Sequence, residues 1–136
     1  MKQNAYPIKN RKEKHVVKSK HYVIVLALLL VTIGGYAGAE EKCGVSIYPG
    51  ATYDSATAEF LKQISPESAA YRTGDKVEKV IAFYKKQPGL DFIGGDQEGG
   101  MFRKGNLDVT VQSPWMDTKT GKMEKDTLIS IVKNKE

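Results

Sequence analysis

The sequence predicts an α+β fold, in which one main amphipathic helix packs on an antiparallel sheet of about four to five strands. Two observations lead to this prediction. Apolar residues recur with helical spacing near residue 80, and two runs at 107–112 and 127–132 alternate or are β-branched, as in strands. An N-terminal segment with the pattern of a signal peptide precedes the predicted domain, which spans residues 46–133.

The main helix is predicted to begin at a capping box. Asp75 stands three residues before Glu78, so its carboxylate is expected to accept hydrogen bonds from amides of the first turn. Pro88 and Gly89 are expected to end the helix after Gln87. The residues that share one face of this helix are Val77, Val80, Ile81 and Tyr84.

A meander of three strands is expected after the helix. The strands are predicted at 101–104, 107–112 and 127–132. Gly105-Asn106 fits a two-residue type II′ turn, and 117–121 reads as a hairpin loop.

Less regular patterns precede the main helix. Strands are predicted at 46–48 and 68–73, and a short helix at 54–64 with Asp54 or Ser55 as its cap. The glycine-rich segment 94–100 and the segment 40–45 are predicted to be flexible.

Residues 1–39 have the three parts of a secretory signal peptide. A basic start is followed by the apolar run 22–33 and by the small residues Ala37-Gly38-Ala39, so cleavage is expected between Ala39 and Glu40. The apolar run is shorter than the ~20 residues that a membrane span needs. The alternative is that residues 22–39 stay uncleaved as an inner-membrane anchor, with the basic start in the cytoplasm. Either reading predicts an exported domain, periplasmic or secreted.

Charge and cysteine content limit the partners and chemistry of the exported part. Residues 1–39 hold seven of the 21 Lys and Arg residues and one of the 16 Asp and Glu residues. The remaining chain therefore has 14 basic and 15 acidic residues and is nearly neutral. No nucleic-acid partner is therefore expected, and contact with the membrane is expected only through an uncleaved leader. Cys43 is the only cysteine, which excludes an internal disulfide and leaves a free thiol or an intermolecular link.

Histidine is absent after residue 39, because His15 and His21 both lie in the leader. A Ser-His-Asp or Cys-His site within the exported chain and an ordinary zinc site are thereby excluded. Asp91, Asp96 and Glu98 do not follow a calcium-loop pattern and are interpreted as a solvated acidic loop. No catalytic residue, metal or cofactor is predicted.

Aromatic residues are frequent in the exported part, and most are expected to form the core. Phe83 at the flank of the helix stripe, Trp115 beside a proline, and Tyr53 are the candidates for an exposed interaction surface.

Three stretches resemble a family of small exported bacterial α+β proteins. They are the turn YPGA at 48–51, the helix D-x-x-E-K-V-x-x-F-Y at 75–84 and the C-terminal hairpin. The resemblance covers most of 45–133 and implies an envelope domain with no assigned activity, so it carries over no catalytic residues.

The leading functional hypothesis is a non-enzymatic binding or interaction module of the bacterial envelope, whose partner is an envelope protein or a small ligand. Two alternatives stay open. One is a small ligand-binding domain that uses the cleft between helix and sheet. The other is an enzyme that works through tyrosines or through carboxylates such as Asp54 and Glu59.

Overall fold

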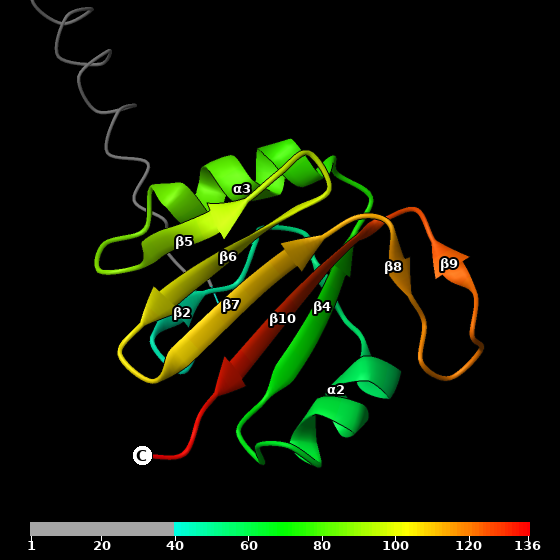
Figure 1. Ribbon diagram of the computed structural model, residues 1–136, viewed down its shortest axis with the longest axis horizontal. Helices are drawn as coiled ribbons and strands as arrows, with labels where there is room; N and C mark the ends of the chain where they lie inside the picture. The colour runs from blue at the N-terminus through cyan, green and yellow to red at the C-terminus, as the bar shows by residue number, and fades with distance from the viewer. Residues whose placement is uncertain (1–39) are drawn as a thin grey trace, which may run out of the picture. The chain divides into compact units, whose positions relative to one another are not determined.

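The computed structural model describes residues 40–136, which form an α+β domain (Figure 1). The leader, with Ala37, Ala39 and the alternative anchor at 22–39, lies outside the described residues. None of the helices within 40–136 has the length and apolar character needed to span a bilayer.

A six-stranded sheet with the strand order β3-β4-β10-β7-β6-β5 forms the centre of the domain, and each neighbouring pair is antiparallel. It is larger than predicted, because β3 and β5 were not expected as strands, and the strand predicted at 46–48 lies in a separate two-stranded sheet. The strands are β3 (Thr52–Tyr53), β4 (Ala69–Thr73), β5 (Asp91–Gly95), β6 (Gly99–Lys104), β7 (Leu107–Gln112) and β10 (Thr127–Lys133).

Two short hairpins flank this sheet. β1 (Glu41–Lys42) pairs with β2 (Val45–Ser46), and β8 (Trp115–Met116) pairs with β9 (Met123–Glu124). Residues 117–121 form the expected hairpin loop, in which the backbone N–H of Gly121 donates to the carbonyl of Asp117 over 2.8 Å. Trp115 and Met116 therefore belong to a separate hairpin and do not extend the main sheet.

Helix α3 (Val77–Lys85) covers one face of the sheet. Its predicted apolar stripe is confirmed, since the four residues of the stripe are the buried residues of the helix. They pack on side chains that alternate along the strands, because every second residue of a strand points to the same face. These sheet residues include Tyr71, Phe102, Val109, Val111, Ile129 and Ile131.

Helix α2 (Ser55–Lys62) lies over the opposite face, next to β4 (Figure 1). Its Ala58 packs with Ala70 and Leu128, which alternate with residues of the first core along β4 and β10. The predicted cap is confirmed, because the Asp54 carboxylate accepts a hydrogen bond from the Thr57 amide over 2.8 Å.

The predicted capping box of the main helix is wrong. The residue at the N-cap is Lys76, which makes no side-chain capping bond. The Asp75 carboxylate instead accepts hydrogen bonds from the Tyr48 hydroxyl (2.6 Å) and the Lys79 ammonium (2.9 Å). The Asp75 carboxylate, which the sequence spacing predicted to accept from the helix amides, thus bonds to a tyrosine from a distant part of the chain.

The N-terminal part of the domain is more ordered than the sequence predicted. Residues 40–45, expected to be flexible, hold β1 and the start of β2, and the side chain of Val45 is buried. The Glu40 carbonyl accepts from the Ile47 amide over 2.7 Å. Cys43 is exposed in the hairpin turn, with φ of 54°.

Candidate interaction surface

The three predicted surface aromatics occupy different environments. Tyr53 is 49% exposed and packs edge-on against Tyr71, with 5.6 Å between ring centroids. Phe83 is half-buried against Tyr48 and Tyr84. Trp115 is only 2% exposed, so its prediction as a surface residue is wrong. It belongs to the core on the α2 face of the sheet, so the three residues do not form one surface.

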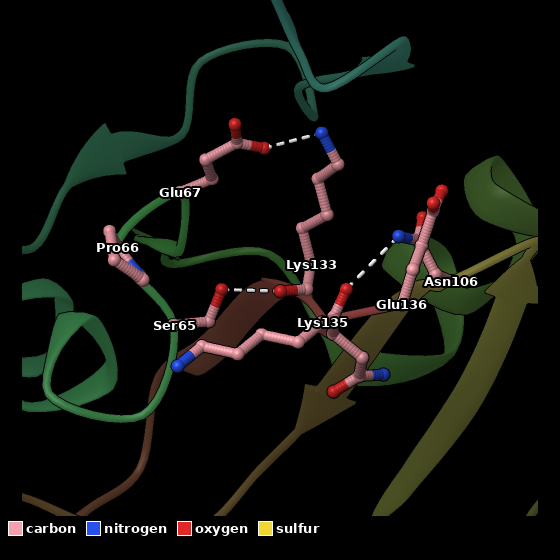
Figure 2. Close-up of a pocket in the computed structure, with 8 residues that line it drawn as sticks. Ser65, Pro66, Glu67, Asn106, Lys133, Lys135 and Glu136 are labelled. Atoms are coloured by element: carbon pink, nitrogen blue, oxygen red, sulfur yellow. Dashed lines mark hydrogen bonds and ion pairs between the residues drawn. The ribbon is translucent and has the colours of Figure 1, made fainter.

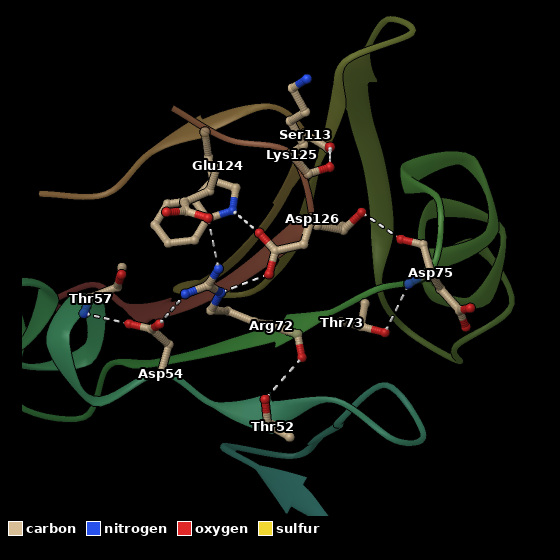
Figure 3. Close-up of polar contacts among 12 residues, drawn as sticks. Thr52, Asp54, Thr57, Arg72, Thr73, Asp75, Ser113, Glu124, Lys125 and Asp126 are labelled. Atoms are coloured by element: carbon tan, nitrogen blue, oxygen red, sulfur yellow. Dashed lines mark hydrogen bonds and ion pairs between the residues drawn. The ribbon is translucent and has the colours of Figure 1, made fainter. Parts of the chain in front are cut away.

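Trp115 packs with Ala58, Ala70 and Leu128, and Arg72 on β4 covers its ring. Figure 3 shows Arg72 at the centre of the acidic residues Asp54, Glu124 and Asp126. The Arg72 guanidinium lies 4.8 Å from the centroid of the indole ring and donates to Asp126 over 2.7 Å. It also pairs with Glu124 at 3.2 Å and Asp54 at 3.5 Å. The indole N–H donates to Asp126 over 2.9 Å. The cluster thus joins β4, the β8–β9 hairpin and the start of α2.

The electrostatics of this cluster are those of a structural ion pair. Desolvation acts to raise the pKa of the Asp126 carboxyl, but hydrogen bonds from Arg72 and Trp115 outweigh it, and the pKa is lowered. A general acid needs a raised pKa, so that the proton is present near neutral pH. The shift at Asp126 is in the opposite direction and favours an anchoring role.

The tyrosines and carboxylates considered for catalysis show similar structural roles. Burial, and then the hydrogen bond to Asp75, raises the pKa of Tyr48, while the bonds from Tyr48 and Lys79 lower the pKa of Asp75. Asp54 caps α2, and Glu59 pairs with Lys62 at 2.8 Å. These contacts are those of packing, helix capping and surface ion pairing.

A pocket of about 470 Å³ lies where the α2–β4 loop, the β6–β7 turn and the C-terminal residues meet (Figure 2). Its polar groups largely satisfy one another. The Lys133 ammonium pairs with Glu67 at 2.6 Å, Ser65 donates to the Lys133 carbonyl, and Asn106 donates to the Asn134 carbonyl over 3.0 Å. Two charged side chains of the lining, Lys135 and Glu136, make no ion pair among the described residues.

The acidic residues of the glycine-rich segment support a turn. Asp96 accepts from the Glu98 amide over 2.8 Å at the connection between β5 and β6. Among residues 40–136 no group of three histidine, cysteine or acidic side chains is placed to hold a metal ion.

Strand β5 is the feature most suited to binding. It is the last strand of the sheet, and among the described residues its outer edge has no strand beside it (Figure 1). Phe92 and Ile93 are 43% and 53% exposed, and the strand contains neither lysine nor proline. Natural edge strands are usually protected by such residues, by shortness or by a bulge. Here a bulge is present at Ile93, between the paired positions Phe92 and Gly94, and Asp91 is the one charged residue of the strand.

Phe92 lies at the rim of the core and is held there on both sides. Its ring centroid is 5.3 Å from that of Phe102, and the Lys85 ammonium of α3 lies 4.2 Å from its ring centroid. Gly100 makes room for the ring, because a Cβ at that position would stand 3.2 Å from a Phe92 ring carbon. A strand beside β5 would meet an ordered aromatic side chain with a cation above it.

The opposite edge of the sheet is better protected. β3 has two residues, and the Asp54 cap of α2 follows it directly. Shortness alone limits pairing at such an edge. The two edges therefore differ in their capacity to take up another strand, and Tyr53 on β3 provides a natural comparison for β5.

Sequence reasoning missed β5 because four glycines lie at 94, 95, 99 and 100. Glycines weaken a strand assignment and favour a loop. The signal that could have identified the strand is the adjacent pair Phe92-Ile93, both strong strand formers, which follows the helix-ending Pro88-Gly89 after two residues.

No protein-family model, curated protein or solved structure matches the chain. The resemblance to a family of small exported proteins therefore stays a prediction.

Proposed function

We propose that the domain is a non-enzymatic interaction module of the bacterial envelope, which binds polypeptide along the open edge of β5. One observation carries the proposal: two large apolar side chains, Phe92 and Ile93, are exposed on an edge strand. The strand contains no proline, and its one charged residue is Asp91 at its start. The envelope location is supported by the signal-peptide pattern of residues 1–39.

The proposed binding mode is strand addition. An extended segment beside β5 would form main-chain hydrogen bonds with the free edge, and its side chains would pack against the exposed apolar residues. The ring of Phe92 is already positioned by Phe102 and Lys85, so little side-chain entropy is lost when it is covered.

The two alternative functions have weaker support. The space between α3 and the sheet is filled by side chains, with Val80, Tyr84 and Phe102 fully buried, which disfavours a ligand cleft there. The lowered pKa values of Asp75 and Asp126 disfavour a carboxylate acid.

Photo-crosslinking in the producing cell tests the proposal. The full-length chain would carry benzoylphenylalanine in place of Phe92 or, as the matched control on the opposite edge, in place of Tyr53. We expect a polypeptide adduct from position 92 and little from position 53. We also expect that adding Ile93→Lys lowers the yield severalfold, because a buried unpaired charge would oppose strand addition. The absence of an adduct at 92, or equal adducts at both positions, would contradict the proposal.

A further inference from the structure

We infer that the segment bound by β5 is β5 of a second copy of this chain, paired antiparallel about a two-fold axis at Ile93. The inference rests on the proposed function and names its partner. A two-fold axis places the same strand on both sides of the interface in opposite directions, which is the requirement for closed pairing of identical subunits. The two six-stranded sheets would then form one continuous sheet across the interface.

Side-chain size along β5 fits this register. With Ile93 on the axis, Phe92 of each copy lies opposite Gly94 of the other, and Asp91 lies opposite Gly95. Gly94 is open to solvent on the side that a Cβ would take, with no atom within 4 Å. Phe92 pairs with the buried Phe102 and Gly94 with the exposed Met101, so the two residues face opposite sides of the sheet, and the Phe92 ring meets no side chain of the residue opposite it. The exposed Ile93 side chains lie at the axis.

Charge along β5 is also complementary in this orientation. Lys85 and Lys86 lie at the end where the strand begins, and Lys85 is already over the Phe92 ring. Asp96 and Glu98 lie at the other end, in the turn to β6. Antiparallel pairing brings the lysines of each copy beside Asp96 and Glu98 of the other, twice by symmetry, and it also brings Asp91 of each copy near Asp96 of the other. Parallel pairing would align like charges at both ends of the strand.

The bulge at Ile93 is compatible with this arrangement. It interrupts pairing with β6 on the inner side of the strand, between Phe92 and Gly94. A bulge also increases local twist, so the two copies are expected to cross at an angle about the shared Ile93 position.

Disulfide trapping at the axis tests the inference. In the full-length chain with Cys43→Ser, the change Ile93→Cys places two identical thiols across the axis. Antiparallel pairs have Cα atoms about 4.5–5.5 Å apart, within the range that a disulfide spans. We expect a disulfide-linked species of twice the chain mass on mild oxidation. The matched variant Tyr53→Cys, on the other edge and similarly exposed, is expected to stay monomeric.

Charge reversal provides a second readout of orientation. Adding Lys85→Glu to the Ile93→Cys variant is expected to lower the trapped fraction severalfold, and adding Glu98→Lys as well is expected to restore it. Thermal unfolding of each variant checks that the domain stays folded. Failure of the second change to restore trapping would contradict the antiparallel orientation.

The outcomes separate this inference from the proposed function. If Phe92 crosslinks to a different polypeptide and the Ile93→Cys variant gives no dimer, the second-copy inference is wrong and the interaction module stands. Equal trapping at positions 53 and 93 also overturns the inference. If neither experiment gives a product, both are wrong.

Discussion

Arg72 brings together residues that the sequence keeps far apart. Its guanidinium reaches Asp54 before α2, Glu124 on β9 and Asp126 before β10, and it covers the Trp115 ring. The burial of Trp115 depends on these tertiary contacts. The position of Trp115 beside Pro114 suggested an exposed side chain. The sequence could not correct this, since it does not show on which surface the β8–β9 hairpin packs.

Replacement of Asp126 by asparagine tests the structural role of this cluster. The lowered pKa of Asp126 means that its stabilising contribution is complete above its unfolded value of about 3.9 and is lost as pH falls through the lower folded value. We expect Asp126→Asn to lower the free energy of unfolding by about 1–3 kcal/mol at pH 7. The variant should also show a flatter decline below about pH 4.

Urea unfolding from pH 2.5 to 7 measures both effects. Glu41→Gln, at an exposed carboxylate without an ion-pair partner among the described residues, is the control and should leave the profile nearly unchanged. Parallel profiles for wild type and Asp126→Asn would show that the cluster does not stabilise the fold.

Elements with strong periodicity were predictable, and those set by distant contacts were not. The stripe of α3 and the alternation of β7 report directly which side chains are buried. The turn at Gly105-Asn106 was also predictable, because Gly105 has a φ of 58°, Asn106 has no positive φ, and a type II′ turn needs glycine at its first position. The start of α3 was misassigned because Tyr48 competes for Asp75, and β5 was missed because its glycines resemble a loop.

The glycines of β5 and β6 differ in how closely other atoms approach them, so the cost in stability of replacing them with alanine is expected to differ. A Cβ on Gly99 would stand 2.5 Å from the Val111 carbonyl oxygen, whereas a Cβ on Gly94 would meet no atom within 4 Å. We expect Gly99→Ala to destabilise the domain by about 1–3 kcal/mol, because the backbone of β7 must move. Gly94→Ala should change stability by less than about 0.5 kcal/mol.

Chemical denaturation of the two variants at equal protein concentration measures this difference. Similar stabilities would show that β6 lies farther from β7 at this position than the structure places it.

At the scale of the whole molecule, the predicted leader would determine where the proposed interaction surface is presented. Its apolar run is too short for an ordinary span, so we expect the exported protein to begin at Glu40. Intact mass spectrometry of the protein recovered from the envelope or medium measures this directly. A mass that retains residues 1–39 would instead favour the anchored alternative.

Hydrogen exchange at β5 tests the central claim, that this edge pairs with another strand, most directly. In the protein isolated from the producing cell, amides of residues 91–95 should exchange more slowly as protein concentration rises, because pairing protects the outer edge. Thr52–Tyr53 on the opposite edge should show no such change, and Ile93→Lys should abolish the protection at β5. Exchange at 91–95 that is fast and independent of concentration would contradict pairing of β5 between two copies.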